Sequence, residues 1–189
     1  LAARLKERLP DASELTLAFH TNGRPSRGTL LTMIAEAGTQ SFVRRNSQII
    51  PINPQDHVAS ISIADRRFVG YPIPWGDVST AFYSTAIPNI TVHLLFPDKG
   101  LTNPKMLAFN TKLLAKPFVK QLASTFVRTF IKGPSETERA QNRCIVWGRV
   151  QNANGQVIEE HFETPDGYRL TTLSAYAAIQ RLLSNQAAI

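Results

Sequence analysis

Cysteine is almost absent from this chain of 189 residues, with Cys144 the only one. A single cysteine excludes an internal disulfide framework and fits a reducing compartment, so we expect a cytoplasmic protein. The histidines are too widely spaced for a Cys/His zinc motif; they are His20, His57, His93 and His161. A chain of this length can bury a hydrophobic core large enough to fold without disulfides or a structural metal ion.

Long hydrophobic runs are also missing. No apolar stretch approaches the ~20 residues of a membrane-spanning helix, and the first residues do not resemble a secretory signal, which predicts a soluble chain. The opening sequence, LAARLKERLP, already follows an amphipathic helical pattern without a start signal. We therefore expect a single domain, residues 1–189, that is part of a longer protein.

The glycine pattern excludes the common nucleotide-binding loops. The chain has ten glycines, but no two are separated by one residue, so the GxGxxG turn of dinucleotide-binding domains cannot be made. A phosphate loop ending in GKS or GKT is missing too. We expect this chain to bind no nucleotide cofactor by itself.

Acidic residues are missing from one long stretch. Residues 99–132 carry seven of the 21 basic residues and no Asp or Glu, whereas the 14 basic residues elsewhere equal the 14 acids in number. The net charge of +7 is therefore local. The aromatic residues here, including Phe118, Phe126 and Phe130, share one side of a predicted helix instead of alternating with basic residues as stacking platforms, which argues against a nucleic-acid partner.

The periodicities predict an α+β fold, with a mixed, largely antiparallel sheet and helices mainly on one face. The expected strands include 14–20 and 89–96, and hairpins are expected around Asn46-Ser47 and Ala64-Asp65. The expected helices are 1–9, 26–37, 77–85 (capped by Asp77), 103–115, a helix from Pro117 to about Phe130, and a last one from about Tyr168.

Asn154-Gly155 is a strong signal for a third hairpin. A two-residue turn at this position predicts a register in which Arg149 faces Glu160 and Trp147 faces Phe162. Cys144 and His161 fall within these strands, where we expect packed or solvent-facing side chains without a catalytic role.

Three stretches carry more polar groups than packing requires. GRPSRGT, residues 23–29, begins a helix whose free N–H groups could hold an anion; the alternative is that Ser26 serves only as the cap of that helix. IPWGDVSTAFYSTAIPNI, residues 73–90, concentrates hydrogen-bonding side chains, although it also fits a capped surface helix. TPDGY, residues 164–168, has the composition of a structural turn.

These stretches, in this order, resemble the saccharopine dehydrogenase-like oxidoreductases, in the part that follows their N-terminal nucleotide-binding domain. The resemblance rests on PSRGT (25–29), VRRN (43–46), IPWGDVST (73–80), YSTAIPNI (83–90), KGPS (132–135) and TPDGY (164–168). It implies a two-part NAD(P)-dependent enzyme whose second domain closes the substrate cleft and often forms the dimer contact. The nucleotide-binding half is absent from this chain, and Ala86 stands where the family pattern has glycine.

The first functional hypothesis is a substrate-binding and dimerisation domain of such an enzyme, with NAD(P) bound by the missing domain. By residue type, Arg27 and the helix start would bind a substrate carboxylate, Asp77 and Thr80 would orient polar groups, and Tyr83 could donate a proton. The full set of candidate substrate-binding residues is Ser26, Arg27, Gly28, Thr29, Trp75, Gly76, Asp77, Thr80 and Tyr83. We also expect a homodimer formed through the sheet, with the basic helices outside the contact.

The second hypothesis is a non-enzymatic interaction domain. Its basic amphipathic helices, residues 104–132, would dock on a membrane surface or an acidic partner. The two hypotheses differ in the surroundings they predict for the apolar stripe of Phe118, Leu122, Phe126 and Phe130. Burial by the sheet would favour the first hypothesis, and exposure would favour the second.

Overall fold

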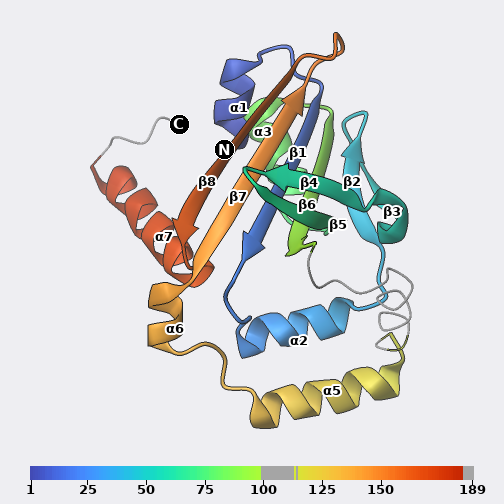
Figure 1. Cartoon of the computed structure of the whole chain (residues 1–189), viewed down its shortest axis with the longest axis vertical. Coiled ribbons are helices and arrows are strands. Elements are labelled where there is room, and N and C mark those ends of the chain that lie inside the picture. The colour runs from blue at the N-terminus through green and yellow to red at the C-terminus, as the bar shows by residue number, and fades with distance from the viewer. Residues whose placement is uncertain (99–112, 114, 185–189) are drawn as a thin grey trace.

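The computed structural model describes residues 1–98, 113 and 115–184, and it has the expected α+β fold (Figure 1). The strands form one eight-stranded sheet: β1 (Glu14–Thr21), β2 (Ser41–Arg45), β3 (Gln48–Ile52), β4 (Ala59–Ile63), β5 (Arg66–Pro72), β6 (Asn89–Pro97), β7 (Arg143–Gln151) and β8 (Val157–Pro165). The described helices are α1 (Ala2–Arg8), α2 (Arg27–Glu36), η1 (Pro54–His57), α3 (Asp77–Thr85), α5 (Pro117–Phe130), α6 (Glu136–Gln141) and α7 (Gly167–Leu183). The predicted helix 103–115 lies almost wholly outside the described residues.

The sheet is mixed and largely antiparallel, as predicted. Its main order is β3-β2-β6-β1-β7-β8, and β5 joins β4 to the outer side of β6. Among the described strands, β1 and β6 form the one parallel pair, and β1 also pairs antiparallel with β7. Strand β1 therefore lies in the middle of the sheet, between two strands that follow it by many residues.

Helices α1 and α3 cover one face of this central part (Figure 1). Val78, Ala81 and Thr85 are the buried residues of α3, and their spacing places them on one side of the helix. They pack with α1 and with alternating residues of the central strands, such as Leu15 of β1 and Ile90 of β6. This is the larger of the two hydrophobic clusters.

The opposite face is covered by strands instead of helices. The hairpin of β4 and β5 contributes Ile61, Ile63 and Phe68 to a second cluster, which includes Ala18 of β1 and Trp147 of β7. Both this hairpin and that of β2 and β3 form where the sequence predicts them. Their turns use Asn46, Ser47 and Ala64 at positive φ.

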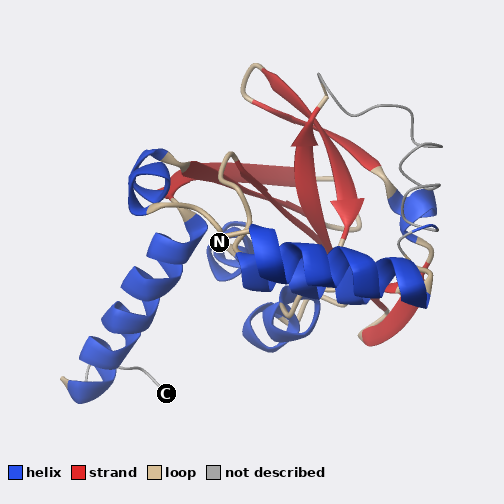
Figure 2. Ribbon diagram, turned by 90° about the horizontal axis from the view of Figure 1, so that it is seen from below, coloured by secondary structure: helices blue, strands red, loops and turns tan. Residues whose placement is uncertain are grey.

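Helices α2 and α5 pack on each other beyond the end of the sheet (Figures 1 and 2). Val127 is the one buried residue of α5. The apolar stripe of α5 is exposed, with relative accessibilities of 75% for Phe118, 63% for Leu122, 55% for Phe126 and 67% for Phe130. By the criterion set above, this exposure favours the docking hypothesis for α5. None of the described helices is long and apolar enough to span a bilayer.

The predicted register of the last hairpin is wrong by one residue. Arg149 pairs with Glu159, not Glu160, and Trp147 pairs with His161, not Phe162. The strands are closed by Asn152 and Gln156 around a three-residue loop, in which Gly155 takes a positive φ of 80°. The Asn152 side chain accepts from the backbone N–H groups of Asn154 and Gln156, at 3.1 and 2.9 Å, and so favours this longer loop.

One capping prediction is also wrong. Gly76 precedes the first residue of α3, and Asp77 is that first residue; no side-chain hydrogen bond caps the helix. The Asp77 carboxylate therefore makes no capping hydrogen bond to the start of α3.

Candidate functional site

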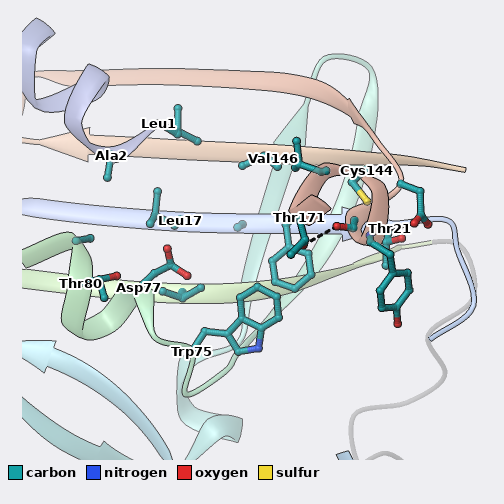
Figure 3. Close-up of a pocket in the computed structure, with 18 of the residues that line it drawn as sticks. Leu1, Ala2, Leu17, Thr21, Trp75, Asp77, Thr80, Cys144, Val146 and Thr171 are labelled. Atoms are coloured by element: carbon teal, nitrogen blue, oxygen red, sulfur yellow. Dashed lines mark hydrogen bonds between the residues drawn. The ribbon is translucent and has the colours of Figure 1, made fainter. Parts of the chain in front are cut away.

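A cavity of about 870 Å³ lies beside the central strand β1, between α3 and the beginnings of α2 and α7 (Figure 3). Its wall is mainly apolar, with contributions from Leu17 and Phe19 of β1, Val92 of β6 and Val146 of β7. A cavity of this size fits a small organic molecule. It lies where the end of β1 meets the beginnings of α2, α3 and α7.

The three stretches that the sequence marks as unusual all reach this cavity. GRPSRGT contributes residues 23–25 and Thr29, and TPDGY contributes its last three residues, 166–168. IPWGDVST contributes Trp75, Asp77 and Thr80. These segments are far apart in the chain. Their convergence was not predicted from spacing, because the strand order that brings them together is a property of the whole sheet.

Four of the nine candidate site residues line the cavity: Thr29, Trp75, Asp77 and Thr80. Trp75 stacks on Phe19 with ring centroids 4.4 Å apart, which places an aromatic surface at the cavity wall. Figure 3 shows Asp77 and Thr80 on the side of α3 that faces Leu17. This group gives the cavity an aromatic side and a polar side.

The other five candidates do not line the cavity; they are Ser26, Arg27, Gly28, Gly76 and Tyr83. Tyr83 is 83% exposed and packs edge-on against Phe82 on the outer side of α3, so its hydroxyl is not placed for the predicted proton donation into this cavity. Arg27 is exposed, away from the cavity, and so is not placed to bind a carboxylate within it.

The start of α2 is engaged by the chain itself. Ser26 caps the helix, since its hydroxyl accepts from the N–H of Thr29 at 3.2 Å. A Cβ added to Gly133, in the KGPS stretch, would lie 3.5 Å from Cα of Ser26, so this loop passes directly over the helix start. The position that was expected to hold an anion therefore has internal partners.

Tyr168 joins α7 to α2 at one end of the cavity. Its hydroxyl oxygen accepts from the N–H of Ser26 at 2.6 Å and lies 3.0 Å from the Thr29 hydroxyl. Burial acts to raise the pKa of Tyr168, but the hydrogen bonds from Ser26 and Thr29 outweigh it, and the net effect is a lowered pKa. Asp166 fixes the same corner, because its carboxylate accepts from the N–H of Tyr168 at 3.0 Å.

Four further residues line the cavity without having been predicted as site residues: Phe19, Cys144, Asp166 and Tyr168. Phe19 lies on the same face of β1 as Leu15 and Leu17, as the alternation of a strand requires. The strand pattern alone does not show that its ring stacks on Trp75 at the cavity instead of packing in the core. For Tyr168, the proline-glycine turn before α7 was the available signal, and it indicated only a turn.

Within the part of the chain that the structure describes, we identify no metal site and no glycine-rich nucleotide-binding turn. The turn between β1 and α2 is Asn22-Gly23-Arg24-Pro25-Ser26, with one glycine, and it lacks the closely spaced glycines that let a pyrophosphate approach the backbone. Among residues 1–98, 113 and 115–184, no three His, Cys, Asp or Glu side chains are grouped as metal ligands.

Comparisons with known proteins found a structural similarity at low sequence identity. No family model matches the chain, and the search of curated proteins found no match. Among solved structures, the apo histidine-tagged saccharopine dehydrogenase (L-Glu forming) from Saccharomyces cerevisiae is similar, with 10% sequence identity and a TM-score of 0.45. The match covers 88% of this chain and 57% of that one, so this chain spans little more than half the length of that enzyme.

Proposed function

We propose that this chain binds a small molecule in the cavity beside β1, as the substrate domain of an NAD(P)-dependent oxidoreductase of the saccharopine dehydrogenase-like kind. The observation that carries the proposal is the convergence of three chain segments, around residues 25–29, 75–80 and 166–168, on one cavity. A mainly apolar cavity with a few converging polar groups is the usual form of a small-molecule site.

In this proposal the cofactor is bound by a separate nucleotide-binding domain. The chain on its own is then expected to show no heat of binding with NAD or NADP in calorimetric titration, since the turn between β1 and α2 lacks the required glycines. A micromolar dissociation constant for either dinucleotide would contradict this division of labour.

The cavity itself can be tested with a neutral probe, 1-octanol. The chain has two tryptophans, so a Trp147→Phe variant leaves Trp75 as the only one and its emission reports on the cavity. We expect a saturable change in the Trp75 emission as 1-octanol is added. The Thr80→Trp substitution should fill the cavity and abolish binding. Because this substitution adds a second tryptophan, binding to that variant is measured by calorimetry. The matched control is Thr129→Trp on the exposed side of α5. Equal binding by both variants would contradict the proposal.

A second function is favoured by the exposed stripe of α5, and we propose that this helix docks on an anionic membrane surface. Lys116, Lys120, Arg128 and Lys132 accompany the stripe, and the sequence has no acidic residue from 113 to 135. A helix with an aromatic face, basic flanks and no acids is typical of interfacial helices. Lysine and arginine beside such a face can reach lipid phosphates while the rings enter the acyl boundary.

Co-sedimentation with lipid vesicles tests this second function. We expect the chain to bind vesicles of phosphatidylcholine and phosphatidylserine at about 3:1, and to bind pure phosphatidylcholine much less. Phe126→Ser with Phe130→Ser should remove most of the binding, whereas Tyr176→Ser with Ile179→Ser, on the equally exposed α7, should retain it. Binding to polyglutamate but not to vesicles would indicate an acidic protein partner and would overturn the membrane proposal.

A further inference from the structure

The charge of the cavity differs from that of the chain. The whole sequence carries a net charge of +7, yet the cavity is lined by two carboxylates, Asp77 and Asp166, and by one guanidinium, Arg24. Arg24 is not free to act as an anion site, since it forms an ion pair of 2.6 Å with Glu138. Among the side chains that line the cavity, the charge left without a partner is therefore negative, in a protein that is basic as a whole.

Asp77 is the carboxylate best placed to meet a ligand. It is half-buried on the cavity side of α3, and within the described part of the chain no group donates a hydrogen bond to it or forms an ion pair with it (Figure 3). Asp166 differs, because it is 2% exposed and already accepts from the N–H of Tyr168. A half-buried carboxylate beside apolar walls gains most from a bound cation or hydrogen-bond donor.

The surroundings of Asp77 also favour a cation with an apolar body. Leu17 and Val92 contribute aliphatic side chains to the wall, and the stacked pair of Trp75 and Phe19 also lines the cavity. Trp75 is 51% exposed, so the apolar surface of its ring remains available to the hydrocarbon part of a ligand. A carboxylate ligand would find no unpaired basic side chain on the described wall.

We infer that the cavity binds an apolar primary amine in its protonated form, with the ammonium group paired to Asp77 and the hydrocarbon part against Leu17, Val92 and Trp75. This inference rests on the proposed small-molecule function and names its ligand class. It replaces the expectation, made from sequence, that the site recognises a carboxylate through Arg27.

Three probes of equal chain length test the ligand class: octylamine, 1-octanol and octanoate, titrated at pH 7 against the Trp147→Phe variant. Trp75 emission reports on the cavity, and calorimetry on the unaltered chain checks that the variant represents it. We expect octylamine to bind at least tenfold more tightly than 1-octanol, and octanoate to bind more weakly than 1-octanol. Asp77→Asn should remove the preference for octylamine and leave binding of 1-octanol unchanged.

The matched control is Asp65→Asn in the turn between β4 and β5, which should retain the preference because Asp65 does not line the cavity. Equal affinity for octylamine and 1-octanol, or tighter binding of octanoate, would overturn the inference while leaving the cavity as a ligand site. No detectable binding of any of the three probes would overturn both the inference and the proposed small-molecule function.

Discussion

Helices α3 and α5 both carry apolar residues along one side, but their surroundings are opposite. The shorter α3 buries Val78, Ala81 and Thr85 against the sheet, whereas the longer α5 buries only Val127 and exposes four large apolar side chains. The difference follows from the connections. Three residues separate α3 from β6, so it must fold back onto the sheet, but α5 has long connections to both β6 and β7. Periodicity thus identifies the apolar face of a helix, and the length of the chain connections decides whether that face packs on the sheet.

The largest expected effect contrasts the two helices directly. Ile87, which follows α3, is fully buried, so Ile87→Ala should lower the free energy of unfolding by about 3 kcal/mol through lost burial and a residual cavity. Phe130→Ala on α5 removes a larger side chain, but this side chain is exposed, so the free energy of unfolding should change by less than about 0.5 kcal/mol. Urea denaturation followed by circular dichroism measures both. A large loss for Phe130→Ala would show that the stripe is covered.

A somewhat smaller effect is expected where β2 is tied to α3. Arg44 is buried, and its guanidinium donates to the carbonyl oxygens of Val78 at 3.0 Å and Ser47 at 2.6 Å, while lying 4.2 Å from the Phe82 ring centroid. Lysine cannot reproduce this fork, so Arg44→Lys should cost about 2 kcal/mol in unfolding free energy. The exposed Arg67→Lys is the control and should be neutral; equal stability of both variants would contradict the assignment.

The smallest effect concerns α1, which covers the same sheet face as α3. A hydrogen bond from Arg8, aided by the charge of Arg4 at 2.8 Å, lowers the pKa of Glu160. Because the pKa of Glu160 is lower in the folded state, this carboxylate stabilises the fold at pH values above its ordinary pKa of about 4.3. The stabilisation is lost as the pH falls through the lowered pKa. Glu160→Gln should therefore reduce the melting temperature at pH 7 and lose this effect near pH 3.

The matched control for Glu160 is Glu159→Gln. Glu159 is exposed and lies 3.7 Å from Arg149, so its replacement should change the melting temperature less at every pH. An equal effect of the two substitutions at pH 7 would contradict the role assigned to Glu160 in holding α1.

Much of the fold could be predicted from the sequence, because it depends on local patterns. Alternation identified β1 and β6, and turn residues identified the hairpins. The predicted register of β7 and β8 was wrong because Asn152 lies two residues before the Asn154-Gly155 pair. Its side chain accepts hydrogen bonds from two backbone N–H groups and so lengthens the loop.

The candidate site was harder to predict, because it depends on which distant segments meet. Thr29, Trp75, Asp77 and Thr80 were identified by residue type and do line the cavity. Arg27 and Tyr83 were chosen for their chemistry alone, and the geometry of the helices that carry them directs both side chains away from the cavity. Tyr168 was missed because its partners, Ser26 and Thr29, lie about 140 residues earlier in the chain.

The central place of β1 has a consequence for how the protein is made. Leu15 and Leu17 leave the ribosome well before β7, residues 143–151, and β1 obtains its second neighbour only when β7 has been synthesised. A nascent chain that stops before that point carries an unpaired apolar strand in the middle of its future sheet, which is the kind of surface that chaperones bind. We therefore expect chains truncated before residue 143 to aggregate instead of folding as a smaller domain, so that the last quarter of the sequence controls when the rest can fold.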